Sequence, residues 1–161
     1  MNISPALVLI ILACSGCRLR DVNHENRQSK VVLGQIQIGN EATEFYIAYG
    51  ADEAILGFSV ASGAGGPRYF PMYASTYRGI PSVVLDVFVS KAEDEMWVRS
   101  SWPTMEVLAY HHIGADTAIT QFGKQAFLKE PVPPYLSGGP IPFPEMEPGN
   151  VIKKATYKHE L

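Results

Sequence analysis

Hydrophobic and polar residues alternate with a period of two along most of the segment 31–130. Successive side chains of a β-strand point to opposite faces of its sheet, so this period indicates strands that bury one face. The segment 82–90 is the clearest case. One of its faces carries only aliphatic side chains, those of Val83, Leu85, Val87 and Val89.

Further segments rich in β-branched and aromatic residues have the same character. The expected strands are 31–38, 43–49, 54–61, 68–77, 82–90, 95–100, 105–113 and 117–127. Short turns separate them, and Pro81 and Pro103 bracket one expected hairpin, as befits a residue that is excluded from the interior of sheets. The spacing predicts a mainly β protein, a small antiparallel β-sandwich with a β-barrel as the alternative. A short helix at 51–57 is an alternative to the start of the third strand.

The N-terminal segment 1–17 contains no charged side chain and holds both cysteines, Cys14 and Cys17. Its aliphatic run, 6–13, is much shorter than the roughly 20 residues that a membrane-spanning helix needs. It has the length of the apolar core of a secretory signal peptide, which is followed by small residues. The segment resembles the signal of bacterial lipoproteins, which ends in an aliphatic residue, two small residues and a cysteine. The resemblance implies that a diacylglycerol is attached to that cysteine and that the preceding peptide is removed.

Two registers of this resemblance are open. Cys17 follows Ser15 and Gly16, the preferred small pair, whereas Cys14 follows an aliphatic residue in the expected place. Cys17 is therefore the expected lipidation site and Cys14 the alternative. The next residue is Arg18 rather than aspartate, which in enteric-type bacteria implies an outer-membrane lipoprotein facing the periplasm.

The competing interpretation of the N-terminus is a buried strand at 6–13 with a redox or metal-binding cysteine pair. A zinc site needs two further ligands at suitable spacing. The chain has no other cysteine, and the nearest histidine, His24, stands alone. The signal-peptide interpretation therefore fits the residues better.

The composition divides the rest of the chain into three parts. Residues 18–30 are polar and without periodicity, as in a tether. Residues 31–130 form the expected globular domain. Residues 131–161 begin with a concentration of prolines and glycines, which predicts an extended Pro-rich tail or a strap over the sandwich.

Charge and composition exclude some classes of protein. The chain has 13 basic and 16 acidic residues, a net charge of −3, and a hydrophobic content of 47%. Disordered chains combine low hydrophobicity with high net charge, so wholesale disorder is not expected. Nucleic-acid binders carry a basic surplus or stripe, and this chain has neither.

The candidate chemistry is sparse. His111 and His112 are adjacent and would point to opposite faces of a strand, His111 inward with the neighbouring apolar residues. His112 with Asp116 and Glu106 is the best candidate for a metal or acid–base site, although a structural role at a strand end is the more common one. No nucleophile motif is complete, so no catalytic residue and no cofactor is assigned.

Aromatic residues are dense in the middle of the chain. Tyrosine and tryptophan fill β-sandwich cores, and they also form sugar- and protein-binding surfaces. The candidate binding residues are Tyr69, Tyr73, Trp97 and Trp102.

The sequence favours a membrane-anchored envelope lipoprotein with a non-catalytic binding or scaffolding domain. Its expected partners are the lipid bilayer, through the acylated cysteine, and an envelope protein or glycan. The first alternative is a secreted or lumenal enzyme, or a metal-binding protein, that uses His112, Asp116 and Glu106. The second rests on residues 158–161, Lys-His-Glu-Leu, which resemble the retrieval signal of the endoplasmic reticulum.

Overall fold

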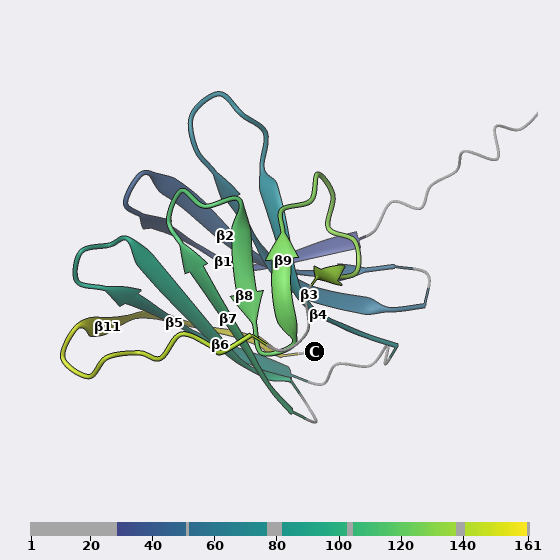
Figure 1. The fold of residues 1–161 in the computed structure, drawn as a ribbon. Helices are drawn as coiled ribbons and strands as arrows, with labels where there is room; N and C mark the ends of the chain where they lie inside the picture. Colours follow the sequence, from purple (N-terminus) through teal and green to yellow (C-terminus); the bar gives the residue numbers. More distant parts are fainter. Residues whose placement is uncertain (1–28, 51, 77–81, 103–104, 138–140, 161) are drawn as a thin grey trace, which may run out of the picture.

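The computed structural model describes residues 29–50, 52–76, 82–102, 105–137 and 141–160. Over these residues the chain forms eleven strands and no helix, arranged in two antiparallel sheets (Figure 1). The sheets are not joined into a closed barrel. The expectation of a small antiparallel β-sandwich is therefore confirmed.

The first sheet is a meander in which each strand pairs with the next along the chain. Its strands are β1 (Ser29–Ile38), β2 (Glu41–Tyr49), β3 (Ala54–Ala61) and β4 (Arg68–Ser75). Pairing of β3 with β2 begins at Ala54, so the helix alternative at 51–57 is not adopted. The meander leaves β1 and β4 at the two edges of the sheet.

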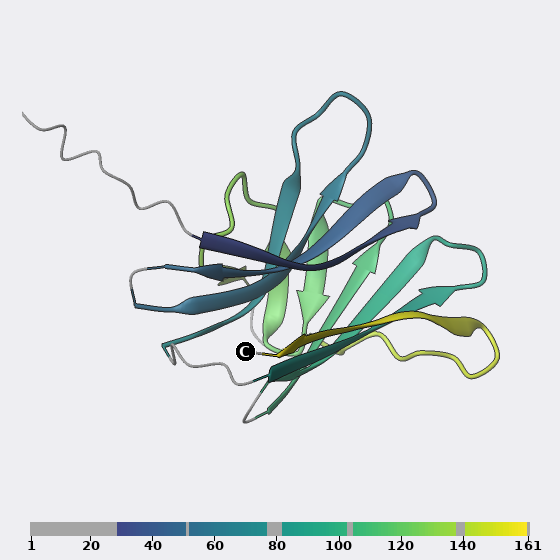
Figure 2. The same ribbon diagram turned by 180° about the vertical axis from the view of Figure 1, so that it is seen from behind.

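The second sheet has the order β10-β9-β8-β7-β6-β5-β11. Its strands are β5 (Ser82–Ser90), β6 (Glu95–Trp102), β7 (Met105–His112), β8 (Thr117–Thr120), β9 (Gly123–Ala126), β10 (Leu136–Ser137) and β11 (Val151–Glu160). The segment expected as one strand at 117–127 is thus a hairpin of β8 and β9. Figure 2 shows the two sheets facing each other, with β11 beside β5.

Alternating side chains of both sheets meet in one hydrophobic core. The pattern predicted for 82–90 is confirmed, because its four inward aliphatic residues are at most 1% exposed. β3 departs from simple alternation and is buried on both faces. Ile55, on its outer face, packs with Tyr46 and Ala48 of β2 in a second, smaller cluster.

The two sheets also meet at one edge. The amide of Tyr69 in β4 donates to the carbonyl of Leu128, and the amide of Leu128 donates to the carbonyl of Tyr69. Leu128 follows β9 of the second sheet. This single antiparallel bridge fixes the start of β4 against the other sheet.

The segment 131–161 consists of two different parts. In the Pro-rich part, the carbonyl of Pro144 accepts a hydrogen bond of 2.9 Å from the indole nitrogen of Trp97 on β6. This contact holds the Pro-rich part against the second sheet, as expected of a strap. Residues 151–160 form a strand, β11, paired with β5 along its length, which the sequence pattern does not predict. Proline cannot donate to a sheet ladder, and β11 begins only after the last proline of the chain.

Candidate functional site

The structure does not bring the candidate metal-binding residues together. Glu106 and His112 lie near opposite ends of β7, about 20 Å apart at the usual rise of a strand. Asp116 pairs with Arg68 at 2.8 Å, and the Nδ1 atom of His112 lies 3.1 Å from the carbonyl oxygen of Ile113. Among the described residues, no group of three or more histidine, cysteine or acidic side chains could hold a metal ion.

His111, the neighbour of His112, is buried and has a partner for each of its ring nitrogens. As expected, His111 points inward and is fully buried. Its Nε2 atom lies 3.0 Å from a carboxylate oxygen of Glu41, and its Nδ1 atom lies 3.2 Å from the carbonyl oxygen of Thr117. The rings of Phe58 and Phe70 flank the imidazole. A carbonyl and a carboxylate both accept hydrogen bonds, so the imidazole is placed to donate to either of them.

Glu41 is the centre of this buried network. Its other carboxylate oxygen accepts hydrogen bonds from the Arg68 guanidinium and from the backbone amide of Gly114. Burial raises the pKa of the Glu41 carboxyl, but the hydrogen bond and charge of His111, the charge of Arg68 and the Gly114 amide outweigh it and lower the pKa. Glu41 and Arg68 belong to the first sheet and His111 to the second. The network therefore links the two sheets by an ion pair and hydrogen bonds centred on Glu41.

The four candidate aromatic residues have different environments. Trp102 lies in the core and contacts Tyr73 edge to face, with ring centres 5.6 Å apart. Trp97 lies on the outer face of the second sheet, packed on Tyr110, and is only 4% exposed beneath the strap. Of the four, only Tyr69 lines the groove on the first sheet.

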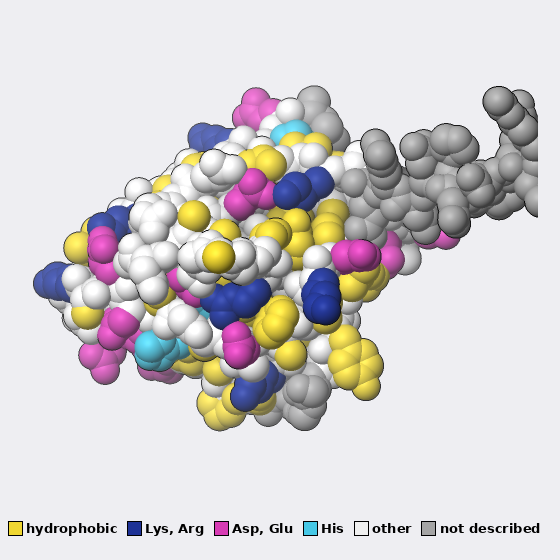
Figure 3. All heavy atoms as spheres, turned by 90° about the horizontal axis from the view of Figure 1, so that it is seen from above, with side chains coloured by type: hydrophobic (Ala, Val, Ile, Leu, Met, Phe, Trp, Pro, Cys, Tyr) yellow, Lys and Arg dark blue, Asp and Glu magenta, His cyan; other side chains and the backbone are white. Residues whose placement is uncertain are grey.

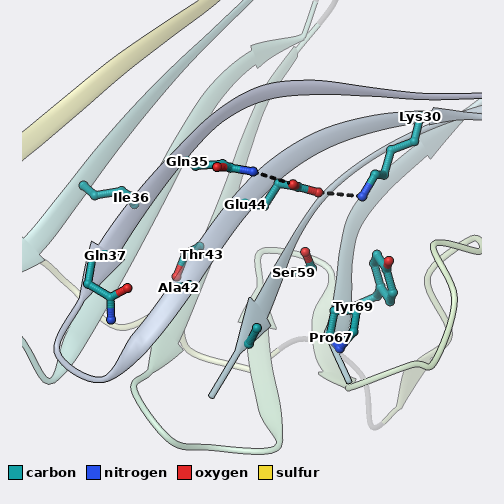
Figure 4. Close-up of a pocket in the computed structure, with 11 residues that line it drawn as sticks. Lys30, Gln35, Ile36, Gln37, Ala42, Thr43, Glu44, Ser59, Pro67 and Tyr69 are labelled. Carbon is teal, nitrogen blue, oxygen red and sulfur yellow. Dashed lines mark hydrogen bonds and ion pairs between the residues drawn. The ribbon is translucent and has the colours of Figure 1, made fainter. Parts of the chain in front are cut away.

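This groove lies on the outer face of the first sheet and has a volume of about 510 Å³. Figure 4 shows Tyr69 at one end and Gln37 at the other, with side chains from β1, β2 and β3 between them. The lining residues are Lys30, Gln35, Ile36, Gln37, Ala42, Thr43, Glu44, Ser59, Ala61, Pro67 and Tyr69. Polar side chains and a small apolar floor therefore share one open surface.

Hydrogen bonds within the groove order its polar groups. The Glu44 carboxylate accepts from the Lys30 ammonium at 2.6 Å and from the Gln35 amide at 2.8 Å (Figure 4). Burial raises the pKa of Glu44, but these two hydrogen bonds and the Lys30 charge outweigh it and lower the pKa. Glu44 is therefore an anion at neutral pH and acts only as an acceptor.

Tyr69 is held in place from two sides. Its ring makes an edge contact with Tyr46, at 5.7 Å between centres, and the Lys30 ammonium lies 5.7 Å from the ring centre. Tyr46 is itself fully buried, and its ring lies over Gly57, where any larger residue would collide with it. A glycine on β3 therefore makes room for the tyrosine that supports Tyr69.

Charged side chains elsewhere on the surface are mixed. On the face seen in Figure 3, acidic and basic side chains are interspersed among hydrophobic and neutral ones. The outer face of the second sheet is similar, where Asp86 accepts from Lys153 at 2.7 Å and from Thr156 at 2.7 Å. Such pairs are typical of a solvated sheet face.

No protein-family model, curated protein or solved structure matches the chain. Over the described part of the chain, there is no helix with the length and apolar character needed to cross a membrane. Both candidate lipidation sites, Cys17 and Cys14, lie outside the described residues. Of the candidate C-terminal retrieval signal, Lys158, His159 and Glu160 are part of β11.

Proposed function

We propose that the chain is a lipid-anchored protein of the bacterial envelope whose β-sandwich is a non-catalytic binding module. The anchor is inferred from the cysteine-terminated apolar segment 1–17. The binding role is carried by one observation, the groove of about 510 Å³ on the first sheet with its internally ordered polar side chains. Ligand sites are usually preformed concave surfaces of roughly 300–1,000 Å³.

The length of chain between Cys17 and the domain limits how far the domain can lie from the membrane. β1 begins at Ser29, and an extended chain between Cys17 and β1 reaches at most about 40 Å. Two or more acyl chains on Cys17 would anchor the protein stably, at about 0.8 kcal/mol for each buried methylene. The sandwich then needs no membrane-binding surface of its own.

The anchor is tested by expressing the full chain in a Gram-negative host fed with labelled palmitate. We expect wild type and Cys14→Ser in the membrane fraction, labelled and with a mass that shows an acylated N-terminal Cys17. Cys17→Ser should be unlabelled and uncleaved. Loss of label in Cys14→Ser alone would move the site to Cys14, and a soluble product cut without acylation would refute the anchor.

A further inference from the structure

The floor of the groove can recognise a ligand only through side chains. β2 and β3, which form its floor, each pair with a strand on both sides, so their backbone amides and carbonyls are already hydrogen-bonded. An extended peptide laid on this face would find no backbone partners for its own amides, and peptides usually add to the edge of a sheet instead. A ligand rich in hydroxyl groups does not have this problem, because each hydroxyl can donate to one side chain and accept from another.

The polar side chains of the groove favour an uncharged ligand. The only charged groups among the lining residues are Lys30 and Glu44, and they neutralise each other at 2.6 Å. A charged ligand would have to break this pair to gain one of its partners. The remaining polar groups include Gln35, Gln37 and Ser59, whose amides and hydroxyl both donate and accept.

Tyr69 supplies an aromatic surface at one end of the groove (Figure 4). The face of an aromatic ring carries partial negative charge and attracts the slightly positive C–H groups of an apolar edge. Sugar rings present such C–H groups on one face and hydroxyls around their rim. The contacts of Tyr69 with Tyr46 and Lys30 fix the ring before any ligand arrives, which lowers the entropic cost of binding.

We propose that this groove binds a neutral oligosaccharide. One sugar ring stacks on Tyr69, and hydroxyl or acetamido groups of the glycan hydrogen-bond to Glu44, Gln35 and Gln37. Small apolar residues on the floor, Ala42 and Ala61 among them, contact the remaining C–H groups. This ligand assignment rests on the binding role proposed above and adds the chemical class of what is bound.

The first experiment presents the full chain, purified in a zwitterionic detergent without a sugar headgroup, to an array of immobilised neutral and acidic oligosaccharides. We expect retention on neutral oligosaccharides and none on acidic ones. The proposal is overturned if no neutral oligosaccharide retains the protein, or if acidic ones retain it more strongly. The best-retained soluble oligosaccharide then serves as the probe in calorimetric titrations.

Variants of the groove locate the site. We expect Tyr69→Ala to weaken binding of the probe about tenfold or more, and Tyr69→Phe, which keeps the ring, to stay within about twofold. The matched control is Tyr135→Ala, because Tyr135 is 80% exposed and does not line the groove. Equal affinities for all three variants would refute the groove as the glycan site.

A second variant guards against a loss of fold in Tyr69→Ala. Glu44→Gln keeps the shape of the side chain but removes the anionic acceptor, and we expect affinity to fall about fivefold while the unfolding transition stays cooperative. Unchanged affinity in Glu44→Gln would contradict its proposed contact. Failure of all glycan binding in a protein that is still acylated on Cys17 would remove the ligand assignment and leave the anchor standing.

Discussion

Glu41 shows how a single buried carboxylate depends on its partners. Its side chain is about 1% exposed and contacts Arg68, His111 and the Gly114 amide. Taking a charge out of water costs several kcal/mol, and the ion pairs and hydrogen bonds of the network offset this cost only while all of the partners are present. Removing one charge therefore costs more than the net contribution of the whole network.

We predict that Glu41→Gln destabilises the protein by about 3–5 kcal/mol at pH 7, because it leaves the Arg68 guanidinium with the exposed Asp116 as its remaining counter-charge and places a neutral amide opposite His111. Chemical denaturation of wild type and variant measures this difference. The control is Glu130→Gln, an exposed carboxylate, which should change stability by no more than about 0.5 kcal/mol. A similar loss in both variants would contradict the role given to Glu41.

The same network predicts how stability depends on pH. The folded protein lowers the pKa of Glu41, so the unfolded state takes up the proton first as the pH falls. The contribution of Glu41 is complete above the ordinary carboxyl pKa of about 4.3 and is lost as the pH falls from there through the lower folded pKa. The difference in unfolding free energy between wild type and Glu41→Gln should therefore shrink below about pH 4.3. A difference that stays constant down to acid pH would be inconsistent with a charged Glu41.

At the scale of single elements, β11 and β1 fit together through one glycine. Tyr157 of β11 lays its ring against Gly34, at an irregularity in the pairing of β1 with β2. Its hydroxyl donates to the carbonyl oxygen of Gln35 at 2.8 Å, and its ring also contacts Phe45 of the core. A methyl group on residue 34 would overlap the ring.

We predict that Gly34→Ala destabilises the fold by about 1–3 kcal/mol, because it forces Tyr157 away from β1. In a protein that already carries Tyr157→Ala, the Gly34→Ala substitution should have little further effect on stability. The two effects should therefore be strongly non-additive in a double-mutant cycle of thermal or chemical unfolding. Gly66→Ala is the control, since nothing lies within 4 Å of a side chain at that position. Additive effects of Gly34→Ala and Tyr157→Ala would show that the ring is not what the glycine accommodates.

The sequence predicts elements well where one face is apolar and poorly elsewhere. The strands at 54–61 and 82–90 were predicted with the bounds that β3 and β5 have. β11 was missed because its inward residues Ala155 and Tyr157 are flanked by lysines and follow a shift in register between Lys153 and Ala155. The prolines that precede β11 also favoured an extended tail for the whole segment 131–161. The last of them, Pro148, lies before the strand begins at Val151.

At the scale of the whole molecule, the site depends on strand order, which periodicity does not reveal. The groove is lined by both Lys30 of β1 and Tyr69 of β4. These two residues lie on the same face of one sheet only because β1 to β4 pair in the order of a meander. Tyr69 was a candidate because aromatic residues are dense there, but Lys30, Gln35 and Glu44 were indistinguishable from ordinary solvated residues. Glu41 and Arg68 were missed for the same reason, since burial of a charge across two sheets has no local signal.

β11 is expected to be essential to the whole sandwich, because it covers the edge of β5 and contacts β1. We predict that a chain without residues 149–161 loses its cooperative unfolding transition and its near-ultraviolet circular dichroism. Adding a synthetic peptide of these residues should restore both, as in other cases of strand addition. A truncated chain that still unfolds cooperatively would contradict this prediction.

The contact between Tyr157 and Gln35 also has a kinetic consequence. The two residues are 122 positions apart in the chain, and long-range pairings of this kind form slowly because a large loop must close first. Until they form, the outer edge of β5 has unpaired backbone groups and can pair with another chain. A slow closing step therefore defines a period in which the protein is prone to aggregate and in which a chaperone would protect it.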